Sequence, residues 1–116
     1  MNDDVKKVLV IDDEPDIREL LDLTLTRMGL EVTTAEDLAG GRRELQSDDF
    51  SFCLTDMRLP DGNGLDLVTE IGEKYPNLPV AMITAHGKVE DAVYALKQGA
   101  FDFVSKPVDL GVLRKL

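Results

Sequence analysis

Short apolar runs alternate with longer amphipathic segments along this chain, and the alternation restricts the possible folds more than any other feature. The first run, at residues 8–11, is uninterrupted by polar residues, as expected of a parallel strand that is covered on both faces. Apolar residues at helical spacing follow between Pro15, which suits a first helical turn, and Gly29, which favours a helix end. The pattern occurs five times, with strands predicted at residues 8–11, 31–34, 50–55, 79–84 and 101–105 and helices at residues 15–28, 38–46, 65–74, 89–96 and from 109 onward.

This regular alternation predicts an α/β fold in which helices cover both faces of a parallel sheet. The first, third and fourth strands are almost entirely apolar, so we expect them in the centre of the sheet, whereas Thr, Glu and Asp in the second and fifth strands suit its edges. This placement fits a flavodoxin-like (βα)5 fold, a doubly wound parallel sheet of five strands in the order 2-1-3-4-5. We expect the helix at residues 38–46 to be weak, because it contains Gly40 and Gly41.

Residues 1–116 are predicted to form a single domain, because the chain contains no linker and no low-complexity segment. The apolar pattern of the last predicted helix, at Leu110, Leu113 and Leu116, is unfinished where the sequence ends. We therefore expect this helix to be truncated and the natural protein to continue beyond residue 116.

Charge and composition exclude several classes of function. A net charge of −10 argues against direct binding of nucleic acid, since phosphate backbones are bound by an excess of Lys and Arg. No apolar run approaches the ~20 residues that span a bilayer, so no membrane association is expected, and the polar residues 1–7 are not a secretory signal. The single cysteine, Cys53, is expected to be a small buried core residue, which suits a cytoplasmic protein.

Polar residues stand where four of the predicted strands end. Asp12 and Asp13 follow the first strand, Asp56 follows the third, Thr84 ends the fourth, and Lys106 follows the fifth. In an open α/β sheet, ligands bind outside the carboxyl ends of the strands, at the point where the strand order reverses. The sequence therefore predicts that three carboxylates, a hydroxyl and an ammonium group meet in one crevice.

These residue types suit phosphoryl transfer at a bound metal ion. Clustered carboxylates repel one another, and a hard divalent cation such as Mg²⁺, with Mn²⁺ as a substitute, removes that conflict while leaving room for phosphate oxygens. An Asp can act as the nucleophile and form an acyl phosphate. Thr84 can donate a hydrogen bond to a phosphoryl oxygen and Lys106 can neutralise another. No Ser-His or Cys-His pair competes for the role, because the only histidine is His86.

Four segments of the chain closely resemble the receiver domains of bacterial two-component response regulators: VLVIDDE at 8–14, LTDMRLPDG at 54–62, ITA at 83–85 and KP at 106–107. The resemblance implies that Asp56 takes a phosphoryl group from a sensor histidine kinase. It also implies that Asp13, Asp56 and the backbone carbonyl of Arg58 bind Mg²⁺, and that Asp12 acts mainly through water. Thr84 and Lys106 are then the groups that hold the phosphoryl group, and Phe103 corresponds to the family's switch aromatic.

Residues 57–66 and 99–110 resemble a narrower group, the receivers of transcriptional activators that work with the alternative sigma factor, and within it the type IV pilus regulator branch. This resemblance implies an output domain with ATPase and DNA-binding regions. It further implies that phosphorylation changes the surface formed by helix four, strand five and helix five, with a homodimer as one outcome. Such a domain is a signalling switch and not an enzyme, since it catalyses only its own phosphorylation and dephosphorylation.

Other interpretations compete with this one. Taken singly, Asp12 and Asp13 also suit the N-terminus of a helix. A Mg²⁺-dependent phosphatase acting on external substrates is a second hypothesis, but such enzymes place an Asp two residues after the nucleophile, where this chain has Arg58. A nucleotide-binding module is disfavoured because no glycine fingerprint follows the first strand, and Gly62 and Gly64 indicate a turn. A receiver that is never phosphorylated is disfavoured by the complete site but is left open.

Overall fold

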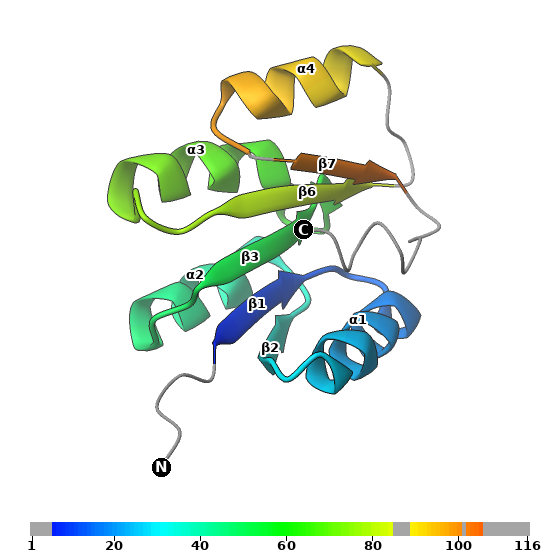
Figure 1. Cartoon of the computed structure of the whole chain (residues 1–116). Coiled ribbons are helices and arrows are strands. Elements are labelled where there is room, and N and C mark those ends of the chain that lie inside the picture. The colour runs from blue at the N-terminus through cyan, green and yellow to red at the C-terminus, as the bar shows by residue number, and fades with distance from the viewer. Residues whose placement is uncertain (1–5, 85–88, 101, 106–116) are drawn as a thin grey trace.

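The computed structural model describes residues 6–84, 89–100 and 102–105, which form a parallel sheet flanked by helices (Figure 1). The sheet strands are β1 (Lys7–Ile11), β2 (Glu31–Ala35), β3 (Phe52–Asp56), β6 (Val80–Thr84) and β7 (Asp102–Ser105). The helices are α1 (Pro15–Arg27), α2 (Leu38–Ser47), α3 (Gly64–Lys74) and α4 (Val89–Lys97), and a separate small hairpin consists of β4 (Arg58–Leu59) and β5 (Gly62–Asn63). Within these ranges, no helix has the length and apolar character that crossing a bilayer requires.

The five-stranded sheet has the order β2-β1-β3-β6-β7, with all neighbouring strands parallel. Since β4 and β5 lie outside this sheet, the observed order is the predicted 2-1-3-4-5. The three central strands are those that the sequence marks as almost entirely apolar, and the strands with Thr, Glu and Asp lie at the edges. The predicted fold class and strand order are therefore confirmed.

Alternate residues of a strand point to opposite faces of the sheet, and each face has its own apolar core. In β1, Val8 and Val10 belong to a buried cluster with leucines of α1, whereas Leu9 and Ile11 belong to a second cluster with side chains of α2, α3 and α4. Figure 1 shows the same division, with α1 on one side of the sheet and α2 and α3 on the other. The prediction that helices cover both faces is confirmed.

The segment after β3 differs most from the prediction. The strand begins at Phe52 instead of residue 50, and its last residue is Asp56. The chain then forms the antiparallel hairpin β4-β5, in a stretch for which the sequence indicated only a turn. The backbone φ of Gly62 is +151°, a value that residues with a Cβ rarely adopt. This angle explains why glycine stands there. The predicted helix from residue 109 lies outside the described residues.

Helix α2 contains two consecutive glycines and nevertheless spans Leu38–Ser47, as predicted within one residue. A Cβ at Gly41 would lie 2.5 Å from the Cδ1 of Ile11, so glycine at this position allows α2 to approach β1 closely. The helix begins with a cap, because the carboxylate of Asp37 accepts a hydrogen bond from the Gly40 N–H at 2.7 Å. Close packing and capping thus offset the low helix propensity that glycine causes.

Cys53 offers a direct test of this core. Its side chain is fully buried in β3, and burial raises the pKa of its thiol to about 12. Since the thiolate is the reactive form, we expect Ellman's reagent at about pH 8 to leave the native protein unlabelled while it labels the denatured chain completely. Labelling of the native protein as fast as the denatured chain would show that β3 is not in the centre of the sheet.

Candidate functional site

Four carboxylates meet at the carboxyl ends of β1 and β3. Asp12, Asp13, Glu14 and Asp56 each offer an oxygen, and these oxygens lie within 4.8 Å of one another. The pairing of the two strands explains the arrangement, since Ile11 is in register with Thr55, and the next residue of each strand is an aspartate. The three acids of the predicted site, Asp12, Asp13 and Asp56, are therefore brought together.

The two strand-end aspartates are buried, whereas the other two acids are exposed. The exposed fraction is 1% for Asp12 and 6% for Asp56. Asp13 and Glu14 follow the strand and face solvent. The cluster therefore has a closed side in the sheet and an open side through which an ion or a phosphoryl group can enter.

Backbone hydrogen bonds hold the segment that follows β1. The Asp12 N–H donates to the carbonyl of Ala35 at 3.0 Å, which continues the pairing with β2 beyond the strand. The Asp12 carboxylate accepts from the Glu14 N–H at 2.9 Å, and the Nη1 of Arg18 donates to the Asp12 carbonyl at 2.7 Å. These bonds turn the chain at Asp12 so that α1 begins at Pro15 with the acidic residues beside it.

The segment that follows β3 is held in a similar way. The Met57 N–H donates to the carbonyl of Ile83 at 3.1 Å, and the Gly64 N–H donates to the carbonyl of Met57 at 2.7 Å. A Cβ at Gly64 would overlap the backbone carbonyl of Asp56, so only glycine fits at the start of α3. The Arg58 N–H points toward the Asp56 carboxylate, at 3.4 Å from its Oδ1.

Glu14 is the one acid of the cluster for which the sequence predicted no role in the site. It is the last residue of the segment VLVIDDE at 8–14, but the resemblance of this segment to receiver domains implies no role for it. Its signal in the sequence is that it is the third consecutive acid after the first strand. Glu14 is also the residue that precedes the first turn of α1, with extended backbone angles, and a carboxylate oxygen of its side chain lies within 4.8 Å of those of the three aspartates.

The remaining predicted site residues are described in part. Thr84 is the last residue of β6 and is in register with Ser105, one residue beyond the pair formed by Asp56 and Ile83. Its backbone therefore lies at the same edge of the sheet as the acidic cluster. Phe103 is in register with Met82, and for both Thr84 and Phe103 only the backbone is described. Lys106 lies outside the described residues.

The cluster suits a hard divalent cation. All four groups that meet there are carboxylates, and oxygen ligands are those that Mg²⁺, Mn²⁺ and Ca²⁺ prefer. The described part of the site contains no thiolate or imidazole, the ligands typical of zinc. Mutual repulsion of the carboxylates decreases when a cation binds between them, so the fold favours occupation by a metal ion.

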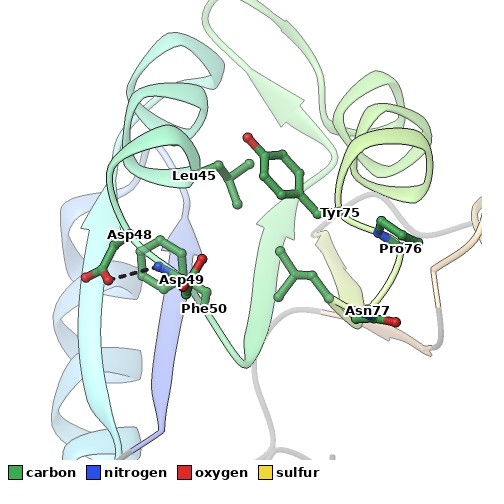
Figure 2. Close-up of a pocket in the computed structure, with 8 residues that line it drawn as sticks. Leu45, Asp48, Asp49, Phe50, Tyr75, Pro76 and Asn77 are labelled. Atoms are coloured by element: carbon green, nitrogen blue, oxygen red, sulfur yellow. Dashed lines mark hydrogen bonds between the residues drawn. The ribbon is translucent and has the colours of Figure 1, made fainter.

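A hollow of about 270 Å³ lies at the other end of the sheet (Figure 2). Its walls come from the segments that lead into β3 and β6, so it faces the amino ends of these strands. Leu45, Phe50 and Tyr75 provide apolar surface, and Asp48 at the rim is held by Lys7, whose Nζ lies 2.9 Å from the carboxylate. This ion pair raises the pKa of Lys7 and lowers that of Asp48. None of the four clustered acids lines the hollow.

Comparisons with known proteins identify similar sequences and folds. The family profile of the response regulator receiver domain matches residues 8–116. The response regulator protein PilR of Pseudomonas aeruginosa is 58% identical over 111 residues, which are 96% of this chain and 25% of PilR. The chain therefore spans about a quarter of the length of this curated relative.

Two solved structures show the same fold. The beryllofluoride-activated NtrC4 receiver domain dimer is similar with a TM-score of 0.91 and 34% identity, covering 96% of this chain and 92% of that one. The response regulator protein TrrA from Thermotoga maritima, in complex with Mg²⁺-BeF, is similar with a TM-score of 0.86 and 29% identity, covering 96% and 95%.

Gly64 and Gly72 form a matched pair for testing how closely α3 approaches Asp56. Both lie in α3, but a Cβ at Gly64 meets the Asp56 backbone whereas a Cβ at Gly72 meets nothing within 4 Å. We expect Gly64→Ala to destabilise the fold by about 1–3 kcal/mol through overpacking, and Gly72→Ala to stabilise it by about 0.5–1 kcal/mol. Chemical denaturation measures both values, and equal effects would contradict the close approach.

Proposed function

Because the chain belongs to the response regulator receiver family, as the sequence predicted, we propose that it is a phosphorylation-operated switch with Asp56 as the phosphoryl acceptor. The narrower resemblance to receivers of transcriptional regulators is also confirmed, by the similarity to the DNA-binding transcriptional regulator NtrC of Escherichia coli, which is 41% identical over 103 residues, 89% of this chain and 22% of NtrC. The observation that carries the proposal is the meeting of Asp56 with Asp12, Asp13 and Glu14 at the carboxyl edge of the sheet.

Asp56 is suited to act as a nucleophile. It ends a central strand, its carboxylate lies within the acidic cluster, and the next residue, Met57, is hydrogen-bonded to β6 and to the start of α3. A carboxylate oxygen of Asp56 attacks the phosphorus of a kinase phosphohistidine, the P–N bond breaks, and the histidine nitrogen keeps the electron pair. The product is an acyl phosphate on Asp56.

We assign the metal site to Asp13, Asp56 and the backbone carbonyl of Arg58, with Asp12 acting through water. Mg²⁺ bound there, with Mn²⁺ as a substitute, supplies neutralisation of negative charge on the phosphoryl oxygens. The carboxylate donor set of this chain and the Mg²⁺-BeF complex of the similar TrrA support this choice of ion. Thr84 donates a hydrogen bond to one phosphoryl oxygen, and Lys106 forms an ion pair with another.

The longer protein to which this domain belongs is proposed from the length of its relative. PilR is about four times as long as the matched segment, since 25% of it is covered. We infer that this domain, residues 1–116, is followed by an output domain with ATPase and DNA-binding regions, and that a sensor histidine kinase is its phosphoryl donor. The domain itself, with a net charge of −10, does not bind nucleic acid directly. A cytoplasmic location agrees with the free thiol of Cys53.

In this proposal, phosphorylation changes the surface that α4 and β7 form. A phosphoryl group adds about −1.5 to −2 charges, and Thr84 and Lys106 are placed to respond to it. Movement of Thr84 vacates space for Phe103, which is two residues before the strand partner of Thr84. Helix α4 exposes Val93, Tyr94 and Leu96, each about half accessible to solvent, and such a surface favours self-association. The similar NtrC4 receiver is a dimer when activated by beryllofluoride.

Acetyl phosphate tests the acceptor. We expect incubation with acetyl phosphate and Mg²⁺ to add one phosphoryl group to the protein, and Asp56→Asn to remain unmodified, because an amide oxygen is too weak a nucleophile. Intact-mass spectrometry measures both. Equal labelling of Asp56→Asn and the parent would overturn the assignment.

Metal dependence is the control for the same experiment. EDTA should prevent labelling of the parent, and Asp13→Ala should abolish both Mg²⁺ binding and labelling. Asp12→Ala should weaken them less, since Asp12 acts through water. If both variants bind Mg²⁺ like the parent, the acidic cluster is not the metal site.

Sedimentation with and without beryllofluoride tests the readout. We expect beryllofluoride and Mg²⁺ to cause self-association of the parent, and Thr84→Ala to accept phosphate at Asp56 without associating. Leu96→Glu on α4 should abolish association, whereas Leu23→Glu on α1, where the side chain is similarly exposed, should not. Unchanged sedimentation of the parent would contradict the proposed switch.

A further inference from the structure

Asp61 caps a helix that is distant in the sequence. It lies in the tight turn between β4 and β5, and its Oδ1 accepts a hydrogen bond from the Leu38 N–H at 2.8 Å while its Oδ2 accepts from the Ala39 N–H at 3.0 Å. Leu38 and Ala39 are the first two residues of α2. Their N–H groups have no partner within a helix, so a side chain from elsewhere in the fold satisfies them.

The two bonds place negative charge at the amino end of α2. The N–H groups of Leu38 and then Ala39 are the largest causes that lower the pKa of Asp61, with a smaller contribution from Arg42. Asp61 is therefore ionised at neutral pH, and both of its oxygens accept. Asp37, the local cap of the same helix, serves a different N–H group, that of Gly40. The first turn of α2 thus has one local cap and one cap from the loop after Asp56.

Apolar packing at the same place supports the contact. A Cβ at Gly62 would lie 2.8 Å from the Cδ1 of Leu38, so the turn of the hairpin rests directly on the first residue of α2. Leu59 and Leu38 are both buried in the core cluster on this face of the sheet. The tip of the hairpin is therefore fixed to α2 by two hydrogen bonds and by close packing.

The base of the hairpin is fixed separately. The Gly64 N–H donates to the Met57 carbonyl at 2.7 Å, and Asn63 caps α3 by accepting from the Leu65 N–H at 2.8 Å. Arg58, which is in register with Asn63, lies between this base and the tip at Asp61. The position of the Arg58 backbone relative to Asp56 therefore depends on both attachments.

We propose that Asp61 is a positioning residue for the metal site: by capping α2 it holds the β4-β5 hairpin so that the Arg58 carbonyl stays in place to complete the ligands from Asp13 and Asp56. This inference rests on the proposed function, which makes the Arg58 carbonyl a ligand. Asp61 itself does not contact the ion or the phosphoryl group. Groups that orient metal ligands in this way commonly change metal affinity when they are removed.

Asp61→Ala and Asp37→Ala provide a matched comparison. Both remove a carboxylate cap from the first turn of α2, so both should lower the melting temperature. Only Asp61→Ala also removes the two hydrogen bonds that attach the hairpin carrying Arg58 to α2. Titration with MgCl₂, followed by amide chemical shifts at a temperature where all variants are folded, should give a dissociation constant about tenfold higher for Asp61→Ala and within about twofold of the parent for Asp37→Ala.

Asp61→Asn provides a second variant with nearly unchanged volume. Its amide keeps one acceptor oxygen but presents an NH₂ group to the second N–H donor, so its affinity for Mg²⁺ should lie between those of the parent and Asp61→Ala. The inference is overturned if Asp61→Ala binds Mg²⁺ like the parent, or if Asp37→Ala weakens binding equally, which would indicate a general effect of α2 stability. Failure of the parent itself to bind Mg²⁺ would instead overturn the proposed function, and with it the ligand role on which this inference rests.

Discussion

The parallel pairing of β1 with β3 holds two buried carboxylates side by side, and the rest of the site depends on it. Ile11 and Thr55 are in register, so Asp12 and Asp56 leave the ends of adjacent strands together. Apolar side chains on both faces of the sheet keep β1 and β3 buried in the interior, even though a carboxylate stands at the end of each strand. The free energy of core burial therefore offsets the repulsion between the carboxylates. That repulsion, in turn, favours the binding of a cation.

Close backbone contacts give the site its remaining shape. Glycine at position 64 allows α3 to begin against the Asp56 carbonyl, and glycine at position 41 allows α2 to pack against Ile11 of β1. Both contacts bring helix N-termini toward the edge of the sheet where the acids lie. The hairpin between them, with Asp61 at its tip, links the acceptor strand to α2. The loop after Asp56 is consequently attached at two places, to Asp56 through the start of α3 and to α2 through Asp61. We expect a displacement of the loop at one of these attachments to move it at the other.

The two ends of the sheet differ in what they can bind. At the carboxyl ends, carboxylate oxygens from two buried and two exposed acids gather in one cluster, which suits an ion and a phosphoryl group that arrives with its donor. At the amino ends, the hollow beside Leu45 and Tyr75 has apolar walls, and its carboxylate Asp48 is already held by Lys7. The chemistry of the domain therefore follows the polarity of the strands, because the acidic cluster lies at their carboxyl ends and the apolar hollow at their amino ends.

The periodicity of the chain and the composition of its strands determined the order of the sheet strands and the meeting of Asp12, Asp13 and Asp56. Apolar runs specify central parallel strands, and the carboxyl ends of parallel strands share one edge. The proximity of Glu14, the β4-β5 hairpin and the cap from Asp61 to Leu38 were not predictable in this way. A short turn has no periodicity, and a hydrogen bond between segments more than 20 residues apart leaves no local pattern. These features depend on how closely α2, α3 and the loop after Asp56 pack, and only the tertiary structure decides that distance.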